Sequence, residues 1–160
     1  MSVEIWKYLE EVPDPEIPVI SVIDLGVVRD IEQKEDGSVE VTITPTYSGC
    51  PAMSEIAIGI RLKLMEYGFR QIRIIEQLSP AWTTAWMSEE GKAKMKAYGI
   101  APPKEQTLTG ELFEEETGIE CPQCGSLDTN LVSQFGSTAC KAMYQCQTCL
   151  EPFDYFKCHH

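Results

Sequence analysis

Two Cys-x-x-Cys pairs near the C-terminus constrain the fold of this chain more than any other feature. They are Cys121-Pro-Gln-Cys124 and Cys146-Gln-Thr-Cys149, separated by residues 125–145. Each pair can present two thiolates to one ion, and four thiolates complete the tetrahedral coordination of a structural zinc site. The separation is slightly longer than is usual for this pattern, and it accommodates two strands and a turn. The spacing predicts a zinc ribbon over 119–160, with rubredoxin-like iron and a four-cysteine iron–sulfur cluster as alternatives.

The residues around the pairs have the pattern of a small three-stranded unit. Strands are predicted over 129–135, 139–145 and 150–156, with a turn at Gly136-Ser137. A unit of about 40 residues buries little apolar surface when it folds. We therefore expect the bound metal to supply much of its stability.

Three of the seven cysteines, Cys50, Cys140 and Cys158, lie outside the pairs. An odd number of cysteines cannot pair fully, and in a reducing compartment cysteines favour metal ligation or reactive thiols over disulfides. We interpret Cys140 and Cys158 as packed or exposed thiols. His159 and His160 are the only histidines. Their position at the very end is typical of an expression tag, so we assign them no chemistry.

Cys50 lies where an alternating pattern over 38–44 meets a helical pattern that begins at Pro51. Proline suits the first position of a helix, which places Cys50 at or near the N-cap. Unpaired N–H groups and the positive end of the helix dipole favour a thiolate at that position. The alternative interpretation is a small buried hydrophobe that fills a strand-to-helix corner.

The first hundred residues alternate between helical and strand patterns. Helices are predicted over 2–11, 51–67 and 83–98, strands over 27–31, 39–44 and 70–78, and turns at 24–26 and 35–37. This order indicates an α+β fold, a small helix-covered β-sheet whose third strand runs parallel to a neighbour. We predict this domain over 1–100, an acidic, proline-bearing linker over 101–118, and the ribbon over 119–160.

The charge of the chain excludes some functions. It carries 25 acidic and 13 basic residues, a formal net charge of −12. Such a field repels phosphate backbones, so we expect no nucleic-acid partner.

The sequence has no apolar run of membrane-spanning length and no signal-peptide pattern at its start, which predicts a cytoplasmic protein without a membrane partner. No histidine precedes residue 159 to activate a thiol, so we do not expect an enzyme.

Four segments together resemble a known domain. They are Asp14-Pro-Glu-Ile-Pro18, Asp24-Leu-Gly26, Thr46-Tyr-Ser-Gly-Cys-Pro51 and the tryptophan-containing stretch 79–90. This set is similar to the domain shared by iron–sulfur cluster assembly factors of the metal-sulfur cluster biosynthesis family. With the ribbon and the ending Phe-Asp-Tyr-Phe-Lys-Cys, the resemblance covers nearly the whole chain and extends to accessory proteins of the phenylacetyl-CoA epoxidase system.

The resemblance implies an accessory factor of phenylacetate degradation that assists assembly of an iron–sulfur cluster or metal centre. The functional cysteine of the family corresponds to Cys50, and the acidic residue of its Asp-Leu-Gly motif to Asp24. One cysteine cannot hold a cluster, so a transient cluster would need ligands from a second copy in a homodimer, a partner or the client. The implied partners are subunits of the epoxidase complex or its iron–sulfur flavoprotein reductase. The alternative function is that of a structural adaptor of the complex. The alternative role of Asp24 is that of a turn residue whose side chain is hydrogen-bonded to its own backbone.

Overall fold

The computed structural model describes residues 2–46, 52–102, 118–136 and 141–156. These residues form two compact units that divide after Gly91. The predicted linker lies mostly outside the described residues, so the predicted boundaries 1–100, 101–118 and 119–160 stay a prediction. No helix in the described part of the chain is both long enough and apolar enough to cross a membrane.

A three-stranded sheet forms the centre of the first unit. The strands are β1 (Val28–Gln33), β2 (Val39–Ile43) and β3 (Ile72–Glu76), in the order β1-β2-β3. β1 and β2 form an antiparallel hairpin, and Gly37 allows its tight turn with a φ of 83°. β3 runs parallel to β2, with Val39 opposite Ile72. The parallel third strand confirms the prediction from the helical connection.

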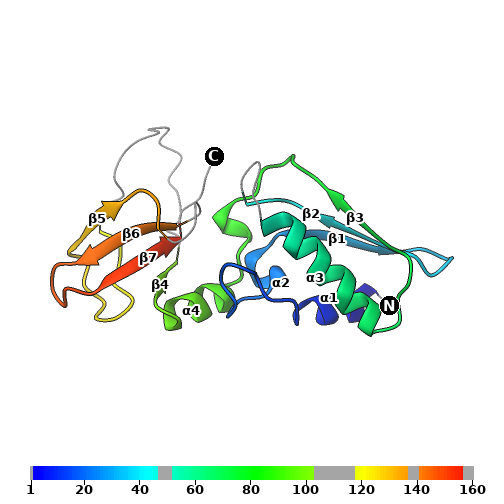
Figure 1. Cartoon of the computed structure of the whole chain (residues 1–160), viewed down its shortest axis with the longest axis horizontal. Coiled ribbons are helices and arrows are strands. Elements are labelled where there is room, and N and C mark those ends of the chain that lie inside the picture. Colours follow the sequence, from blue (N-terminus) through cyan, green and yellow to red (C-terminus); the bar gives the residue numbers. More distant parts are fainter. Residues whose placement is uncertain (1, 47–51, 103–117, 137–140, 157–160) are drawn as a thin grey trace. The chain divides into compact units, whose positions relative to one another are not determined.

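Helices α1 (Ser2–Leu9) and α3 (Ala52–Glu66) pack against each other beside this sheet (Figure 1). The buried side chains of this layer come from both the strands and the helices. They are Ile5 and Leu9 of α1, Val39, Val41 and Ile43 of β2, and Ile56, Ile60 and Leu64 of α3. Each contributes about 1.5–3 kcal/mol when it is fully buried. The buried residues alternate along β2 and recur every fourth residue along α3, as one-sided burial of a strand and a helix requires, whereas Tyr67, which continues the α3 spacing, is exposed.

Two short segments differ from their predicted form. The predicted turn at 24–26 overlaps one helical turn, α2 (Val22–Leu25), whose C-cap is Gly26. The predicted helix over 83–98 is a 3-10 turn, Thr84–Trp86, followed by α4 (Glu89–Ala97). The hydroxyl of Ser88 accepts a hydrogen bond of 2.9 Å from the Gly91 N–H. Ser88 therefore caps the helix and sets its start later than the helical periodicity indicates.

The second unit contains a four-stranded sheet in the order β4-β7-β6-β5. The strands are β4 (Ile100–Ala101), β5 (Thr129–Ser133), β6 (Lys141–Cys146) and β7 (Pro152–Phe156). β5, β6 and β7 form the antiparallel ribbon that the sequence predicts, and β4 adds a short parallel strand beside β7. The prediction missed β4 because two residues are too few to show a strand period. The small core of the second unit includes Ile119, Tyr144, Phe153 and Tyr155.

Candidate functional site

The four paired cysteines of the ribbon come together as the sequence predicts. The sulfur atoms of Cys121, Cys124, Cys146 and Cys149 all lie within 4.8 Å of one another. The Cys124 and Cys146 sulfurs are 3.5 Å apart, and those of Cys121 and Cys149 are 3.7 Å apart. A tetrahedral ion with metal–sulfur bonds of about 2.3 Å requires sulfurs about 3.8 Å apart. The arrangement therefore fits one metal ion with no open coordination position.

Two tight turns hold the cysteine pairs in the same way. In the first, the Gly125 N–H donates to the Cys121 carbonyl at 2.9 Å. The residue after each second cysteine has a left-handed backbone, with φ of 75° at Gly125 and 66° at Leu150. A hydrogen bond of 2.8 Å between the Ser126 and Thr148 hydroxyls joins the two turns. Leu150 thus adopts a conformation that favours glycine.

Backbone N–H groups adjust the acidity of these thiols. The N–H groups of Cys149 and Thr148 lie 3.5 and 3.4 Å from the Cys146 sulfur. These bonds, the Cys149 N–H first, lower the pKa of Cys146 to about 6. At Cys149 the Glu151 N–H acts in the same direction, but removal from water and the neighbouring thiols outweigh it and raise the pKa to about 12. A bound cation deprotonates its thiol ligands, so metal binding removes the protons that the raised pKa values keep on these sulfurs.

Asp24 lies in the first unit and is buried. Its Oδ2 accepts a hydrogen bond of 3.2 Å from the Ser21 N–H, and the Asp24 N–H donates to the Ser21 hydroxyl at 3.0 Å. This reciprocal pair is a capping box at the start of α2. Oδ1 accepts a further hydrogen bond of 3.0 Å from the hydroxyl of Ser88. The carboxylate thus fixes both its own turn and a distant segment of the chain.

Sequence reasoning missed Ser88 as the partner of Asp24. The pattern Ser88-Glu89-Glu90 is a helix-start signal that could have shown where α4 begins. Nothing in the sequence shows that its hydroxyl reaches Asp24, because that contact depends on how the segments pack. The indole N–H of Trp82 adds a second link to this turn, a hydrogen bond of 2.9 Å to the Leu25 carbonyl.

Thr44 directly follows β2, and its N–H donates to the Val27 carbonyl at 2.8 Å. Its side-chain hydroxyl is buried and has no hydrogen-bond partner among the described residues. A buried unpaired hydroxyl costs about 1–3 kcal/mol. Cys50 follows in segment 47–51, which lies outside the described residues, as do Cys140, Cys158, His159 and His160.

Comparisons with known proteins divide the chain as its motifs do. Residues 2–65 match the family described as "Iron-sulfur cluster assembly protein". Residues 105–157 match the "PaaD zinc beta ribbon domain". Both Asp24 and Cys50 fall within the first match, and the four paired cysteines fall within the second.

The first unit also has relatives without the ribbon. An "Fe-S protein maturation auxiliary factor" of Porphyromonas gingivalis is 37% identical over 58% of this chain and 88% of its own length. A crystal structure of "Domain of Unknown Function DUF59" from Bacillus anthracis superposes with a TM-score of 0.55 at 26% identity. It covers 58% of this chain and 89% of that one. These similarities support the α+β fold of the first unit.

One relative matches both units. It is the D subunit of the "Putative 1,2-phenylacetyl-CoA epoxidase" of Escherichia coli (strain K12), which is 48% identical over 155 residues. The alignment covers 97% of this chain and 92% of the relative. At this coverage the alignment spans most of both the iron–sulfur assembly match and the PaaD zinc ribbon match. The chain therefore belongs to the family of the phenylacetyl-CoA epoxidase D subunit.

Proposed function

We propose that this protein is an accessory maturation factor for the phenylacetyl-CoA epoxidase complex of phenylacetate degradation. The observation that carries the proposal is the joint match: an iron–sulfur assembly domain within a chain that resembles the epoxidase D subunit along 97% of its length. Relatives of the first unit bear the name Fe-S protein maturation auxiliary factor. We propose that the protein assists assembly of an iron–sulfur cluster or metal centre and catalyses no reaction of its own.

Cys50 is the proposed functional thiol. A single cysteine provides too few ligands for a stable cluster, which commonly takes four thiolates. The cluster is therefore cargo, with the other ligands supplied by a second copy, by a partner or by the client. The proposed clients are the epoxidase subunits and the iron–sulfur flavoprotein reductase. Incomplete ligation suits transfer, because a complete ligand set would retain the cargo.

Asp24 has a proposed role in support of this thiol. Its carboxylate already accepts hydrogen bonds from Ser21 and Ser88. These contacts support a role in shaping the turn beside the end of β2, which leads into the Cys50 segment. We propose that Asp24 acts on the site by positioning this turn.

We further propose that the ribbon metal is structural zinc. Four cysteine thiolates with no open position are typical of structural zinc sites, and zinc has no redox chemistry that would interfere with iron transfer. The four sulfur positions leave no vacancy for a substrate. The ribbon would then stabilise the second unit without taking part in cluster transfer.

A structural adaptor within the complex is the second candidate. The full-length relative is named as a subunit, which favours this candidate because the name describes a component of a complex. The two functions differ in what they require of Cys50. An adaptor needs the surface of the protein, whereas a maturation factor needs the sulfur.

The test replaces Cys50 with serine in cells that depend on the epoxidase. Serine keeps the shape of the cysteine side chain but lacks the soft sulfur that iron prefers. We expect Cys50→Ser to fold, to keep its ribbon metal and to bind its partners, yet to leave the epoxidase or its reductase deficient in iron. Cys140→Ser is the matched control and should load iron normally. Wild-type epoxidase activity and iron content with Cys50→Ser would favour the adaptor function instead.

A further inference from the structure

A hydrogen bond between two side-chain hydroxyls joins the two cysteine turns of the ribbon. Ser126 lies two residues after Cys124, and Thr148 lies between Cys146 and Cys149 in the turn from β6 to β7 (Figure 1). The two hydroxyl oxygens are 2.8 Å apart. We call this contact the hydroxyl bridge. It is not part of the four-sulfur ligand set, which is complete without it.

Each hydroxyl of the bridge belongs to a residue that is fixed within its own turn. The Ser126 carbonyl accepts a hydrogen bond of 2.9 Å from the Cys121 N–H. The Ser126 hydroxyl also accepts a hydrogen bond of 3.1 Å from the Asp128 N–H. In the second turn, the Thr148 N–H lies 3.4 Å from the Cys146 sulfur. The hydroxyl bridge therefore connects two ordered turns, each of which carries two of the four thiols.

Few other contacts hold the two turns together. Backbone hydrogen bonds join them where they continue into β5 and β6, such as the bond of 2.8 Å from the Gln147 N–H to the Asp128 carbonyl. Between the described residues 121–127 and 146–150, the hydroxyl bridge is the only side-chain hydrogen bond apart from the contacts among cysteine sulfurs. The bridge is exposed to solvent, so it joins the turns at their outer edge.

The accessible cysteines lie close in sequence to the bridge. Cys121 and Cys146 are buried, whereas Cys124 is exposed and Cys149 is partly exposed. A competing chelator would therefore reach Cys124 first. The Cys124 sulfur is 3.5 Å from the Cys146 sulfur, which belongs to the other turn. Loss of a shared metal ion thus requires the two turns to move apart, and the hydroxyl bridge opposes that movement.

We propose that the hydroxyl bridge slows exchange of the ribbon metal by holding the two cysteine turns together at their exposed edge. Ser126 and Thr148 are positioning residues, because they act on the site through the turns that carry the ligands. The proposal rests on the proposed zinc site for the identity of the ion, and it is independent of Cys50. In a protein proposed to handle iron, slow exchange keeps the ribbon metal from being displaced.

The test loads the purified full-length chain with one equivalent of zinc and follows zinc transfer to an excess of a chromogenic chelator. Thr148→Val removes the hydroxyl and keeps the branched shape of the side chain. We expect it to release zinc about threefold to tenfold faster than wild type, the factor expected for loss of one hydrogen bond between neutral groups. Thr148→Ser retains a hydroxyl and should release zinc at the wild-type rate.

Ser133→Ala is the matched control. It removes a hydroxyl hydrogen bond of the same length, 2.8 Å to the Phe135 carbonyl, which joins no cysteine turn. This variant should release zinc at the wild-type rate. Cobalt(II) bound in place of zinc should give the same absorption spectrum in every variant, because all four thiolates remain.

A double variant separates the bridge from the other contacts of its members. Ser126→Ala should also speed up zinc release, although it removes the contact with Asp128 as well. The combination of Ser126→Ala with Thr148→Val should release zinc no faster than Ser126→Ala alone, because the bridge can be lost only once.

The outcomes distinguish this proposal from the proposed function. One equivalent of bound zinc together with wild-type release by Thr148→Val overturns the role of the bridge and leaves the zinc site in place. Multiplied effects of the two substitutions overturn it too, because the hydroxyls would then act separately. A changed cobalt spectrum would show that the hydroxyls shape the ligand set itself, which also overturns it. A wild-type chain that binds no zinc overturns both the bridge and the zinc site, whereas iron loading by Cys50→Ser depends on neither.

Discussion

The side-chain hydroxyl of Ser88 donates a hydrogen bond of 3.0 Å to Oδ1 of Asp24, across 64 positions of sequence. The same hydroxyl accepts the Gly91 N–H at 2.9 Å. One serine therefore joins the Asp24 turn to the first turn of α4. This contact leaves little space beside Gly91, where a Cβ atom would lie 2.9 Å from the Asp24 Cβ and 3.2 Å from the Asp24 carbonyl oxygen.

The first prediction concerns this close approach. Gly→Ala in a free helix stabilises by about 1 kcal/mol. At Gly91 we expect the clash to outweigh that gain and to destabilise the protein by about 1–2 kcal/mol. Gly59→Ala is the control, because a Cβ there meets only the Val12 Cγ1 atom, at 3.2 Å. Urea unfolding followed by tryptophan fluorescence measures the free energy of unfolding of both variants. A Gly91→Ala variant more stable than wild type would contradict the close packing of Gly91 against Asp24.

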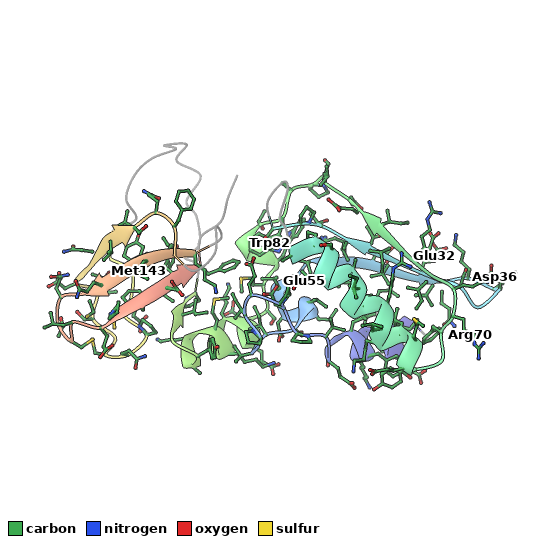
Figure 2. All side chains as sticks on the ribbon, in the orientation of Figure 1. Glu32, Asp36, Glu55, Arg70, Trp82 and Met143 are labelled. Atoms are coloured by element: carbon green, nitrogen blue, oxygen red, sulfur yellow. The ribbon has the colours of Figure 1, made fainter. Side chains whose placement is uncertain are left out.

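The second prediction tests the capping box. Ser21→Ala and Asp24→Ala should each destabilise the first unit by about 1–2 kcal/mol, because each removes a reciprocal hydrogen bond. The double variant should cost less than the sum of the two, by about 0.5 kcal/mol or more. Asp36→Ala, in the hairpin turn that Figure 2 labels, is the control and should be additive with Ser21→Ala. Strict additivity of Ser21→Ala and Asp24→Ala would show that the two do not act as a pair.

The third prediction concerns the left-handed backbone at Leu150. Glycine adopts this conformation without the steric cost of about 1–2 kcal/mol that an L side chain pays. Leu150→Gly should therefore stabilise the ribbon by about 1 kcal/mol in the metal-bound state. Leu127→Gly is the control, since Leu127 is 63% exposed and its φ is negative. It should be neutral or destabilising. Thermal unfolding of the metal-loaded proteins measures the change in stability for each variant. Changes of the same sign for both variants would refute the left-handed backbone at Leu150.

The fourth prediction concerns protons at the four-cysteine site. Without metal, the pKa of Cys149 is raised to about 12 and that of Cys124 is raised, so both thiols hold protons at neutral pH. The Cys146 pKa of about 6 leaves that thiol mostly ionised at this pH. Zinc binding should therefore release at least the two protons held by Cys124 and Cys149, and affinity should fall as the pH is lowered. Calorimetry in two buffers of different protonation enthalpy counts the protons, and release of fewer than two would disagree with these pKa values.

The fifth prediction concerns the independence of the two units. Chelation should melt the ribbon, because its small core depends on the metal, and should leave the first unit folded. The Tyr144 and Tyr155 signals of the ribbon and the amide signals of β2 can be followed separately by nuclear magnetic resonance. Cooperative loss of both sets on chelation would show that the units fold as one.

Periodicity predicted the elements whose residues bury a regular face. The alternation of Val39, Val41 and Ile43 and the spacing of Ile56, Ile60 and Leu64 both correspond to buried faces in the structure. The paired cysteines were equally predictable, because a four-ligand site depends on local spacing and ligand type. The four segments similar to assembly factors led to the family that the comparisons show.

Other features depend on contacts that a single sequence does not contain. The start of α4 follows the Ser88 cap, and the Asp24–Ser88 bond follows from tertiary packing. The exposed apolar residues of α3 were missed for a different reason. The core stripe explained α3 as an amphipathic helix, and Ile58, Leu62 and Met65 needed a structure to show that they stay outside it.

The short strand β4 has a consequence for how the length of this protein can vary. Ile100 pairs beside β7, so the chain joins the ribbon sheet before residue 103. Pro102 and Gly118, on either side of residues 103–117, line the same cavity of about 320 Å³ in the second unit. Insertions between them start and finish in the same unit, and doubling the length of a flexible connection costs only about 0.6 kcal/mol. Natural variants should therefore gain or lose residues here more readily than anywhere in β5, β6 or β7, and a reporter peptide spliced into this position should leave both units intact.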